Sequence, residues 1–297
     1  MGLGAGFQIL ICLYAVLFFY SIGLLTTGMR WYTLWQSICL FLLGGAGNGY
    51  LTSRAMRYFG SEDWSFSAGA ASFVLPCYAS IIFMIVDVLD WMERSKSMVP
   101  LATFTLWAFL WLIFNVPGAY WASQQAYMYS NDKPPCKVSI VKKPIPSLPS
   151  YLGFNVQCFG ASFLIFTTVI FELHYVVTSI WRSYIVGMFF ALFINVNITV
   201  LMTAMVSILF TYLNLKNGNH EWWWRSFFVG FYLAIWVFCY MLWMGALEFS
   251  LSGMAGDLVY CLYAFVFSQF LGLACGTVSV MASWVFVHFL YKASKSD

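Results

Sequence analysis

Four ionisable side chains lie inside long apolar stretches of the chain, where a charge could carry a proton or an ion. Glu172 and His174 lie in IFELHYVV, and Asp87 and Asp90 lie in MIVDVLDW. A charge at the centre of a bilayer costs at least about 2.5–3.5 kcal/mol, so such residues usually pair with a polar group or line a functional path. Glu172 and His174 project about 200° apart on a helix and do not share a face. A relay and a structural role, packing between helices or reaching the headgroups, both remain open.

Metal and cofactor chemistry is not indicated. The histidines His174, His220 and His288 lie in different segments, and none has a ligand-type residue one helical turn away. The glycine-rich strings GLGAGF and GGAGNGY do not match the spacings of phosphate-binding loops. We therefore expect a protein that is not an enzyme and that binds no metal or cofactor.

The composition predicts an all-α, polytopic helical membrane protein. Mean hydropathy is +0.81 and only 8% of residues are charged, whereas soluble domains carry about 25%. A net charge of +3 is too small to suggest a nucleic-acid partner, so the expected environment is the lipid bilayer. Because a spanning helix needs about 20 apolar residues, we predict about eight spans in a single membrane domain covering 1–297. They are 7–25, 32–51, 66–89, 99–122, 152–177, 184–213, 224–244 and 258–291.

An even number of spans places both termini on one side, and basic residues concentrate in cytosolic loops. With the termini in the cytosol, ten of the 14 Lys and Arg residues are cytosolic and four are not. The tail at 292–297 is therefore predicted to be cytosolic. The connection 123–150 is also predicted to be cytosolic. Five of the eight prolines lie in it, and they favour an extended conformation. The N-terminus shows no secretory signal pattern, so we expect the first helix to remain.

Small residues repeat every four positions in two predicted spans, as in helices whose backbones approach closely in a membrane. Such stripes suit packing within the chain or contact with transmembrane helices of client proteins, and both interpretations stay open. Pro76 and Pro117 lie inside spans and should kink them, which frees carbonyls that Asn195 and Asn197 could satisfy. The stripes comprise Gly45 and Gly49 in one span, and Ala264, Ser268, Gly272 and Gly276 in the last.

The string NHEWWWRSFF contains three consecutive tryptophans, Trp222, Trp223 and Trp224, followed by Arg225. Indole rings concentrate at the membrane interface, where an arginine can extend its charge to the headgroups. We predict that these four residues hold the helix at the interface.

Several strings together resemble the nonaspanins, the transmembrane 9 superfamily of endomembrane protein 70 type. NHEWWWRSFF is similar to that family's WWWRSF segment, and FELHYVVTSIW to its IEL-aromatic-aromatic-SSIW segment, which places Glu172 on the family's glutamate. GAGFQIL near the start resembles the opening of the family's second spanning helix. Order and spacing agree from Gly4 to Asp297. The resemblance implies that the chain corresponds to the family's C-terminal membrane region without its lumenal domain.

The resemblance also gives the final residues a role. Members end in Lys-x-Asp or Lys-x-Glu, a cytosolic signal bound by the COPI coat, and this chain ends in Lys295-Ser296-Asp297. It implies an integral membrane protein of the Golgi and endosomes that sorts and localises other membrane proteins in vesicle trafficking. One departure is that a glutamate common in the family falls on Met205 here. The alternative function is a secondary transporter or channel that uses Glu172, Asp87, Asn195 and Asn197.

Overall fold

A computed structural model describes residues 1–23, 30–60, 63–92, 101–129, 153–182, 188–248 and 254–294. These residues form helices and contain no strand, so the predicted all-α class is confirmed. The helices are α1 (Gly2–Ser21), α2 (Arg30–Tyr58), α3 (Trp64–Met92), α4 (Leu101–Leu110), the π-helix η1 (Trp111–Asn115), α5 (Val116–Tyr129), α6 (Phe154–Arg182), α7 (Met188–Lys216), α8 (Trp222–Phe231), α9 (Leu233–Glu248) and α10 (Met254–Ser294).

Within the described ranges, seven helical stretches are long and apolar enough to cross a membrane. The predicted span 32–51 falls in α2, which is 29 residues long but is not among the seven. Its sequence is less apolar because Gln36, Asn48 and two arginines near its end interrupt the aliphatic residues. The seven stretches are Gly2–Ser21, Trp64–Met92, Ala102–Tyr129, Phe154–Val176, Phe189–Lys216, Trp222–Leu247 and Gly256–Ala293.

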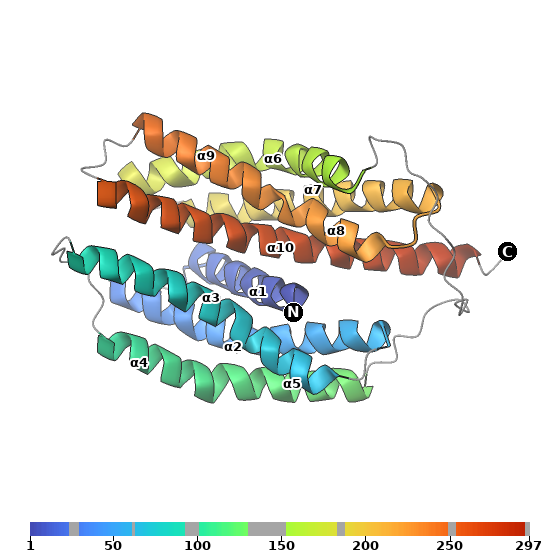
Figure 1. Cartoon of the computed structure of the whole chain (residues 1–297), viewed down its shortest axis with the longest axis horizontal. Helices are drawn as coiled ribbons and strands as arrows, with labels where there is room; N and C mark the ends of the chain where they lie inside the picture. The colour runs from blue at the N-terminus through green and yellow to red at the C-terminus, as the bar shows by residue number, and fades with distance from the viewer. Residues whose placement is uncertain are drawn as a thin grey trace.

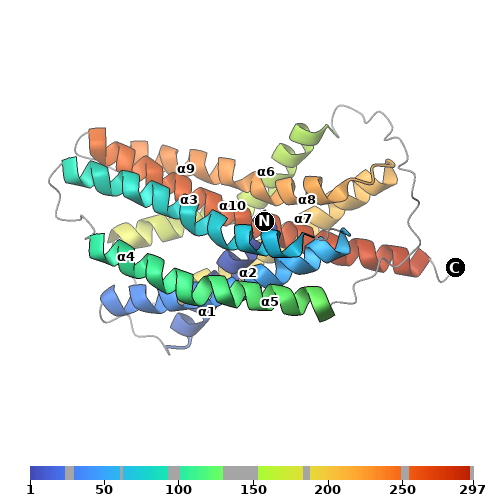
Figure 2. The same cartoon turned by 60° about the horizontal axis from the view of Figure 1, so that its bottom comes forward.

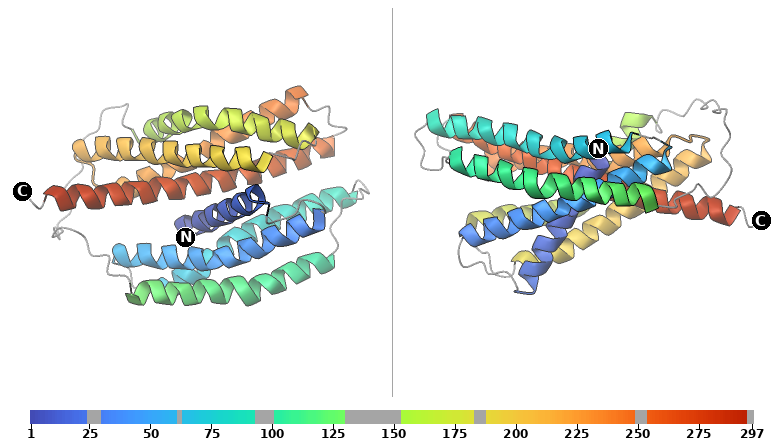
Figure 3. Two further views of the ribbon diagram at one scale, coloured as in Figure 1. Left: turned by 180° about the vertical axis from the view of Figure 1, so that it is seen from behind. Right: turned by 90° about the horizontal axis from the view of Figure 1, so that it is seen from below.

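The helices form two groups that meet at α1 (Figures 1 and 3). In one group, α2, α3 and α5 pack on one another; in the other, α7, α8 and α9 pack on α10, and α6 packs on α7, α8 and α9. Helix α1 lies between the groups and packs on α2 and α3 on one side and on α7 and α10 on the other. A second view shows that these helices run roughly antiparallel to one another (Figure 2).

Two of the seven membrane-length stretches, Ala102–Tyr129 and Trp222–Leu247, are not continuous α-helices. Between α4 and α5, the π-helix η1 precedes Pro117, which lacks a backbone N–H and crowds the carbonyl four residues earlier. Widening the preceding turn into a π-helix accommodates the ring, so the predicted distortion at Pro117 takes this form. The second interruption separates α8 from α9 at Tyr232.

Glycines set the closest helix crossings, because lipid provides no hydrophobic drive for helix association and packing must supply it. A Cβ on Gly6 of α1 would overlap the carbonyl of Leu273 in α10. On Gly49 of α2 it would overlap the carbonyl of Ala119 in α5, and on Gly230 of α8 the backbone of Cys275 in α10. Backbone therefore touches backbone at the α1–α10, α2–α5 and α8–α10 crossings.

Candidate functional site

The segment WWWRSFF forms α8, which is positioned by a tight turn after α7. Gly218 has φ +78°, a conformation that glycine adopts without strain, and the Asn219 side-chain oxygen accepts a hydrogen bond from the Glu221 N–H at 3.0 Å. Trp222 is buried, with 7% of its surface exposed, whereas Trp224 is 61% exposed. Trp222 thus packs inside the bundle instead of facing headgroups, and Trp224 is the ring that faces outward.

Arg225 does not extend into open space but bonds to neighbouring helices. Its guanidinium donates to Gln157 Oε1 of α6 at 2.9 Å and to Asn214 Oδ1 of α7 at 3.4 Å. It also lies 5.8 Å from the centre of the Phe154 ring, within the range of a cation–π interaction. Arg225 therefore joins α6, α7 and α8, and its place at the membrane interface stays a prediction.

One turn deeper lies a buried set of side chains that we call the hydroxyl cluster. Ser283 Oγ is its centre and lies 2.6 Å from Ser207 Oγ, 2.7 Å from Ser226 Oγ and 2.8 Å from Thr211 Oγ1. The carbonyl of Ser279 accepts hydrogen bonds from Ser207 and Ser226 at 2.7 and 2.8 Å. All five residues are at most 2% exposed. The cluster joins α7, α8 and α10 by polar bonds where no water competes.

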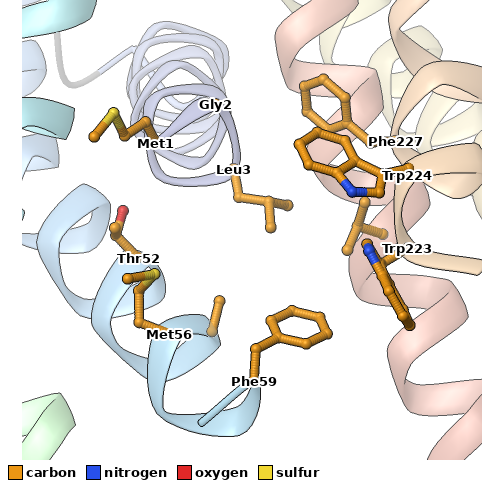
Figure 4. A pocket seen from close by; sticks show the side chains of 11 residues that line it. Met1, Gly2, Leu3, Thr52, Met56, Phe59, Trp223, Trp224 and Phe227 are labelled. Atoms are coloured by element: carbon orange, nitrogen blue, oxygen red, sulfur yellow. The ribbon is translucent and has the colours of Figure 1, made fainter. Parts of the chain in front are cut away.

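Beside α8 an open cavity of about 590 Å³ separates the two helix groups. We call it the aromatic cavity. One wall is the start of α1 and the end of α2, and the other is α8 with Val280 of α10 (Figure 4). The Thr52 hydroxyl at its edge is bonded to the Asn48 carbonyl. With this predominantly apolar and aromatic lining the cavity suits an apolar group. Its principal side chains are Leu3, Met56, Phe59, Trp223, Trp224 and Phe227.

We call the end of the bundle at which α10 finishes the C-terminal end. Helices α2, α5 and α7 also end there, and the start of α1 points toward it (Figure 1). Basic residues gather there. Arg57, Lys216 and Lys292 lie in the last turns of α2, α7 and α10. At the opposite end, α2 begins at Arg30 and α6 finishes at Arg182. The residues Lys295, Ser296 and Asp297 and the connection 130–150 lie outside the described residues.

The polar residues predicted to form a path lie on different helices. Asp87 is on α3, in the group with α2 and α5, while Asn195 and Asn197 are on α7, which packs on α10, α6 and α1. Asn197 bonds to its own helix at the Phe193 carbonyl and to Tyr14 of α1. Among the described side chains, these groups do not converge on one site. Glu172 is on α6, and its side chain lies outside the description.

The small-residue stripes lie at helix contacts within the chain. Gly45 faces Asn115 of η1, and Gly49 faces Ala119 of α5. On α10, a Cβ on Gly272 would lie 2.8 Å from the Phe231 carbonyl, and one on Gly276 would lie 3.1 Å from the Phe227 carbonyl. Ala264 and Ser268 are also buried. Contact of the α10 stripe with a client helix remains a prediction. Such contact would require α10 to separate from α8, the helix that carries Phe227 and Phe231.

Among the described residues, no group of three or more His, Cys, Asp or Glu could hold a metal ion. The hydroxyl cluster and the aromatic cavity were not predicted. A signal for the cluster exists in the pairs Ser207–Thr211 and Ser279–Ser283, each one helical turn apart inside an apolar stretch. The cavity has no such signal, because its walls come from segments far apart in sequence.

The family model described as Endomembrane protein 70 matches residues 1–254. The chain is 28% identical over 306 residues to transmembrane 9 superfamily member 11 of Arabidopsis thaliana, covering 99% of this chain and 45% of that protein. It is 26% identical over 295 residues to transmembrane 9 superfamily member 2 of Mus musculus, again covering 99% of this chain and 45% of the relative. The chain thus spans less than half the length of these relatives. No solved structure matches it.

Proposed function

Because the chain belongs to the Endomembrane protein 70 family and is a membrane protein of the endomembrane system, we propose that it sorts and localises other membrane proteins in the Golgi and endosomes. The resemblance to the transmembrane 9 superfamily seen in the sequence is confirmed by the relatives that carry that name. The proposal assigns retention to the tail Lys295-Ser296-Asp297, bound by the COPI coat, and client contact to the membrane-embedded bundle.

The observation that carries the proposal is the length of α10, which is one continuous helix of 41 residues. At 1.5 Å per residue it is about 60 Å long, against roughly 40–45 Å for a bilayer with its headgroups. Its last turns extend past the neighbouring helices (Figure 1) and end at Ser294, directly before the tail. A helix of this length would hold the tail away from the membrane surface, where a coat protein can reach it.

The charge distribution supports a cytosolic position for that end. Arg57, Lys216 and Lys292 lie at the ends of three helices on the same side as the tail. Cytosolic loops carry an excess of Lys and Arg, so we orient the C-terminal end of the bundle toward the cytosol. In this orientation the C-terminal tail would be on the side of the coat machinery.

Client recognition in this proposal is lateral, within the bilayer. The described residues are membrane-length helices and short connections, so a client would be met through its transmembrane segment. The described polar groups do not assemble a transport path, which is why sorting takes precedence over transport here.

Loss of the chain should redistribute other membrane proteins. We expect that proteomics of Golgi, endosomal and surface fractions will show a defined set of membrane proteins displaced in cells without the chain. Re-expression of the intact chain should restore them. The variant Glu172→Gln, which removes a charge at constant size, should restore them equally well, because sorting requires no relay. Unchanged distributions after loss of the chain would contradict the sorting function, and rescue that fails only with Glu172→Gln would favour transport.

A further inference from the structure

A second cavity, of about 250 Å³, lies where α2 and α10 approach the C-terminal end of the bundle. We call it the α2–α10 cavity. Helix α2 supplies Leu51 and Arg54, and α10 supplies residues on successive turns, among them Met281, Trp284, Val285 and His288. It differs from the aromatic cavity because a cationic side chain, Arg54, and the imidazole of His288 share its lining with apolar side chains. Val285 is 56% exposed, so the cavity opens toward the surroundings of the bundle.

The charge of Arg54 is held at this cavity by an aromatic ring. Its guanidinium carbon lies 5.8 Å from the centre of the Trp284 ring, a cation–π distance. The Trp284 ring is held in turn by Tyr58 of α2, with ring centres 4.8 Å apart. Arginine combines contact with aromatic rings and recognition of phosphate oxygens, so the position of Arg54 at this cavity suits an anionic group.

The rest of the lining suits a molecule with an anionic end and an apolar end. His288 adds a second nitrogen donor on α10, and Lys292 follows one turn later. Met281, Val285 and Phe289 provide an apolar strip, and Phe289 is 63% exposed. Among the described residues, none that lines the cavity is acidic. Basic pockets between membrane helices at a cytosolic surface bind anionic lipid headgroups.

We propose that the α2–α10 cavity binds an anionic phospholipid of the leaflet at the C-terminal end of the bundle. Arg54 and His288 contact the phosphate, and an acyl chain lies along Met281, Val285 and Phe289. Binding at this site is independent of the sorting role, since it depends only on the lining of the cavity. The occupant joins α2 to α10, and therefore one helix group to the other.

The test uses the purified full-length chain in detergent at about 150 mM salt, where long-range charge effects are screened beyond roughly 8 Å. Dioctanoyl phosphatidylserine and dioctanoyl phosphatidylcholine are titrated, and bound lipid is counted by native mass spectrometry. We expect the phosphatidylserine to bind about tenfold more tightly than the phosphatidylcholine, and Arg54→Gln to remove most of that preference. Val285→Trp retains both nitrogen donors but fills the apolar strip, and it should weaken phosphatidylserine binding by about tenfold. This second variant keeps the test decisive if Arg54→Gln fails to fold.

The matched control is Lys216→Gln, which removes a positive charge from the same end of the bundle without touching the cavity. It should change phosphatidylserine binding by less than about twofold, because a screened charge contributes little. Equal binding of the two lipids to the intact chain would overturn the proposal. So would equal losses for Arg54→Gln and Lys216→Gln. Displacement of the lipid by inorganic phosphate at equal concentration would also overturn it, because the site would then bind a free anion.

Discussion

Replacing Gly230 by leucine is expected to destroy the α8–α10 contact and with it the stable bundle. A Cβ at this position would overlap the carbonyl of Cys275 and the amide nitrogen of Gly276. Both are backbone atoms of α10, so no side-chain rotation relieves the overlap and the two helices must separate. Overpacking of a core typically costs 1–3 kcal/mol, and here the displaced element is a whole helix. We expect a loss of roughly 3 kcal/mol or more, visible as aggregation and early thermal unfolding of the detergent-purified protein.

The matched control for this change is Gly160→Leu in α6. Nothing lies within 4 Å of a Cβ at Gly160, and the residue is exposed. Leucine also favours helix over glycine by up to about 1 kcal/mol, so this variant should unfold at or slightly above the temperature of the intact chain. If Gly230→Leu were as stable as Gly160→Leu, the backbone contact between α8 and α10 would not exist as described.

Replacing Ser283 by alanine is expected to produce the second largest loss. The change removes the hydroxyl that lies 2.6–2.8 Å from Ser207, Ser226 and Thr211. Because Ser207 and Ser226 donate their protons to the Ser279 carbonyl, the Ser283 hydroxyl can donate to only one of them and accept from Thr211. Side-chain hydrogen bonds between membrane helices contribute about 0.6 kcal/mol on average and at most about 1.7. Two such bonds therefore predict a loss of about 1 kcal/mol in the free energy of unfolding, measured by thermal unfolding in detergent.

Ser268→Ala isolates the effect of the cluster. Ser268 is equally buried on the same helix, but its hydroxyl donates to the Phe265 carbonyl of its own helix at 2.8 Å. A bond within one helix does not hold two helices together, so this variant should lose less than about 0.5 kcal/mol. Equal destabilisation by the two alanines would mean that the hydroxyl cluster adds nothing to helix association.

The all-α polytopic class could be predicted because a bilayer imposes a length and an apolar composition on each span. The predicted 66–89 lies within α3, and 184–213 overlaps α7. The predicted 32–51 lies within α2, although α2 is not among the seven apolar candidate spans of the described residues. Its polar side chains are used inside the bundle. Asn48, for example, donates to Gln8 Oε1 at 3.0 Å and to the Ala71 carbonyl at 3.1 Å.

The sequence analysis singled out close approach at only some of the positions where small residues repeat. Gly45 with Gly49, and Gly272 with Gly276, are spaced by four and were predicted to contact another helix, either within the chain or in a client. Gly6 and Gly230 have equally close backbone contacts and also have small residues four positions away, Gly2 for the first and Ser226 and Ala234 for the second, but they were not singled out. Their role depends on which helix crosses at that point, and such a crossing is a property of the tertiary structure.

The polar features of the candidate site were the least predictable. Arg225 was expected at the headgroups, yet its partners Gln157 and Asn214 are brought to it by two other helices. The α2–α10 cavity likewise pairs Arg54 with His288, residues more than 200 positions apart in sequence. Single residues of the right type were visible in the sequence, but the partners that give them a function were not.

The most direct test of the sorting role is the localisation of the chain carrying an N-terminal tag, intact and with Lys295 and Asp297 both changed to alanine. Because α10 extends past the neighbouring helices (Figure 1) and ends directly before the tail, we predict that the intact chain will reside in the Golgi. The double variant should leave it and accumulate in later compartments or at the cell surface. Identical localisation of the two proteins would contradict recognition of the tail by the coat, and with it the retention mechanism proposed for this chain.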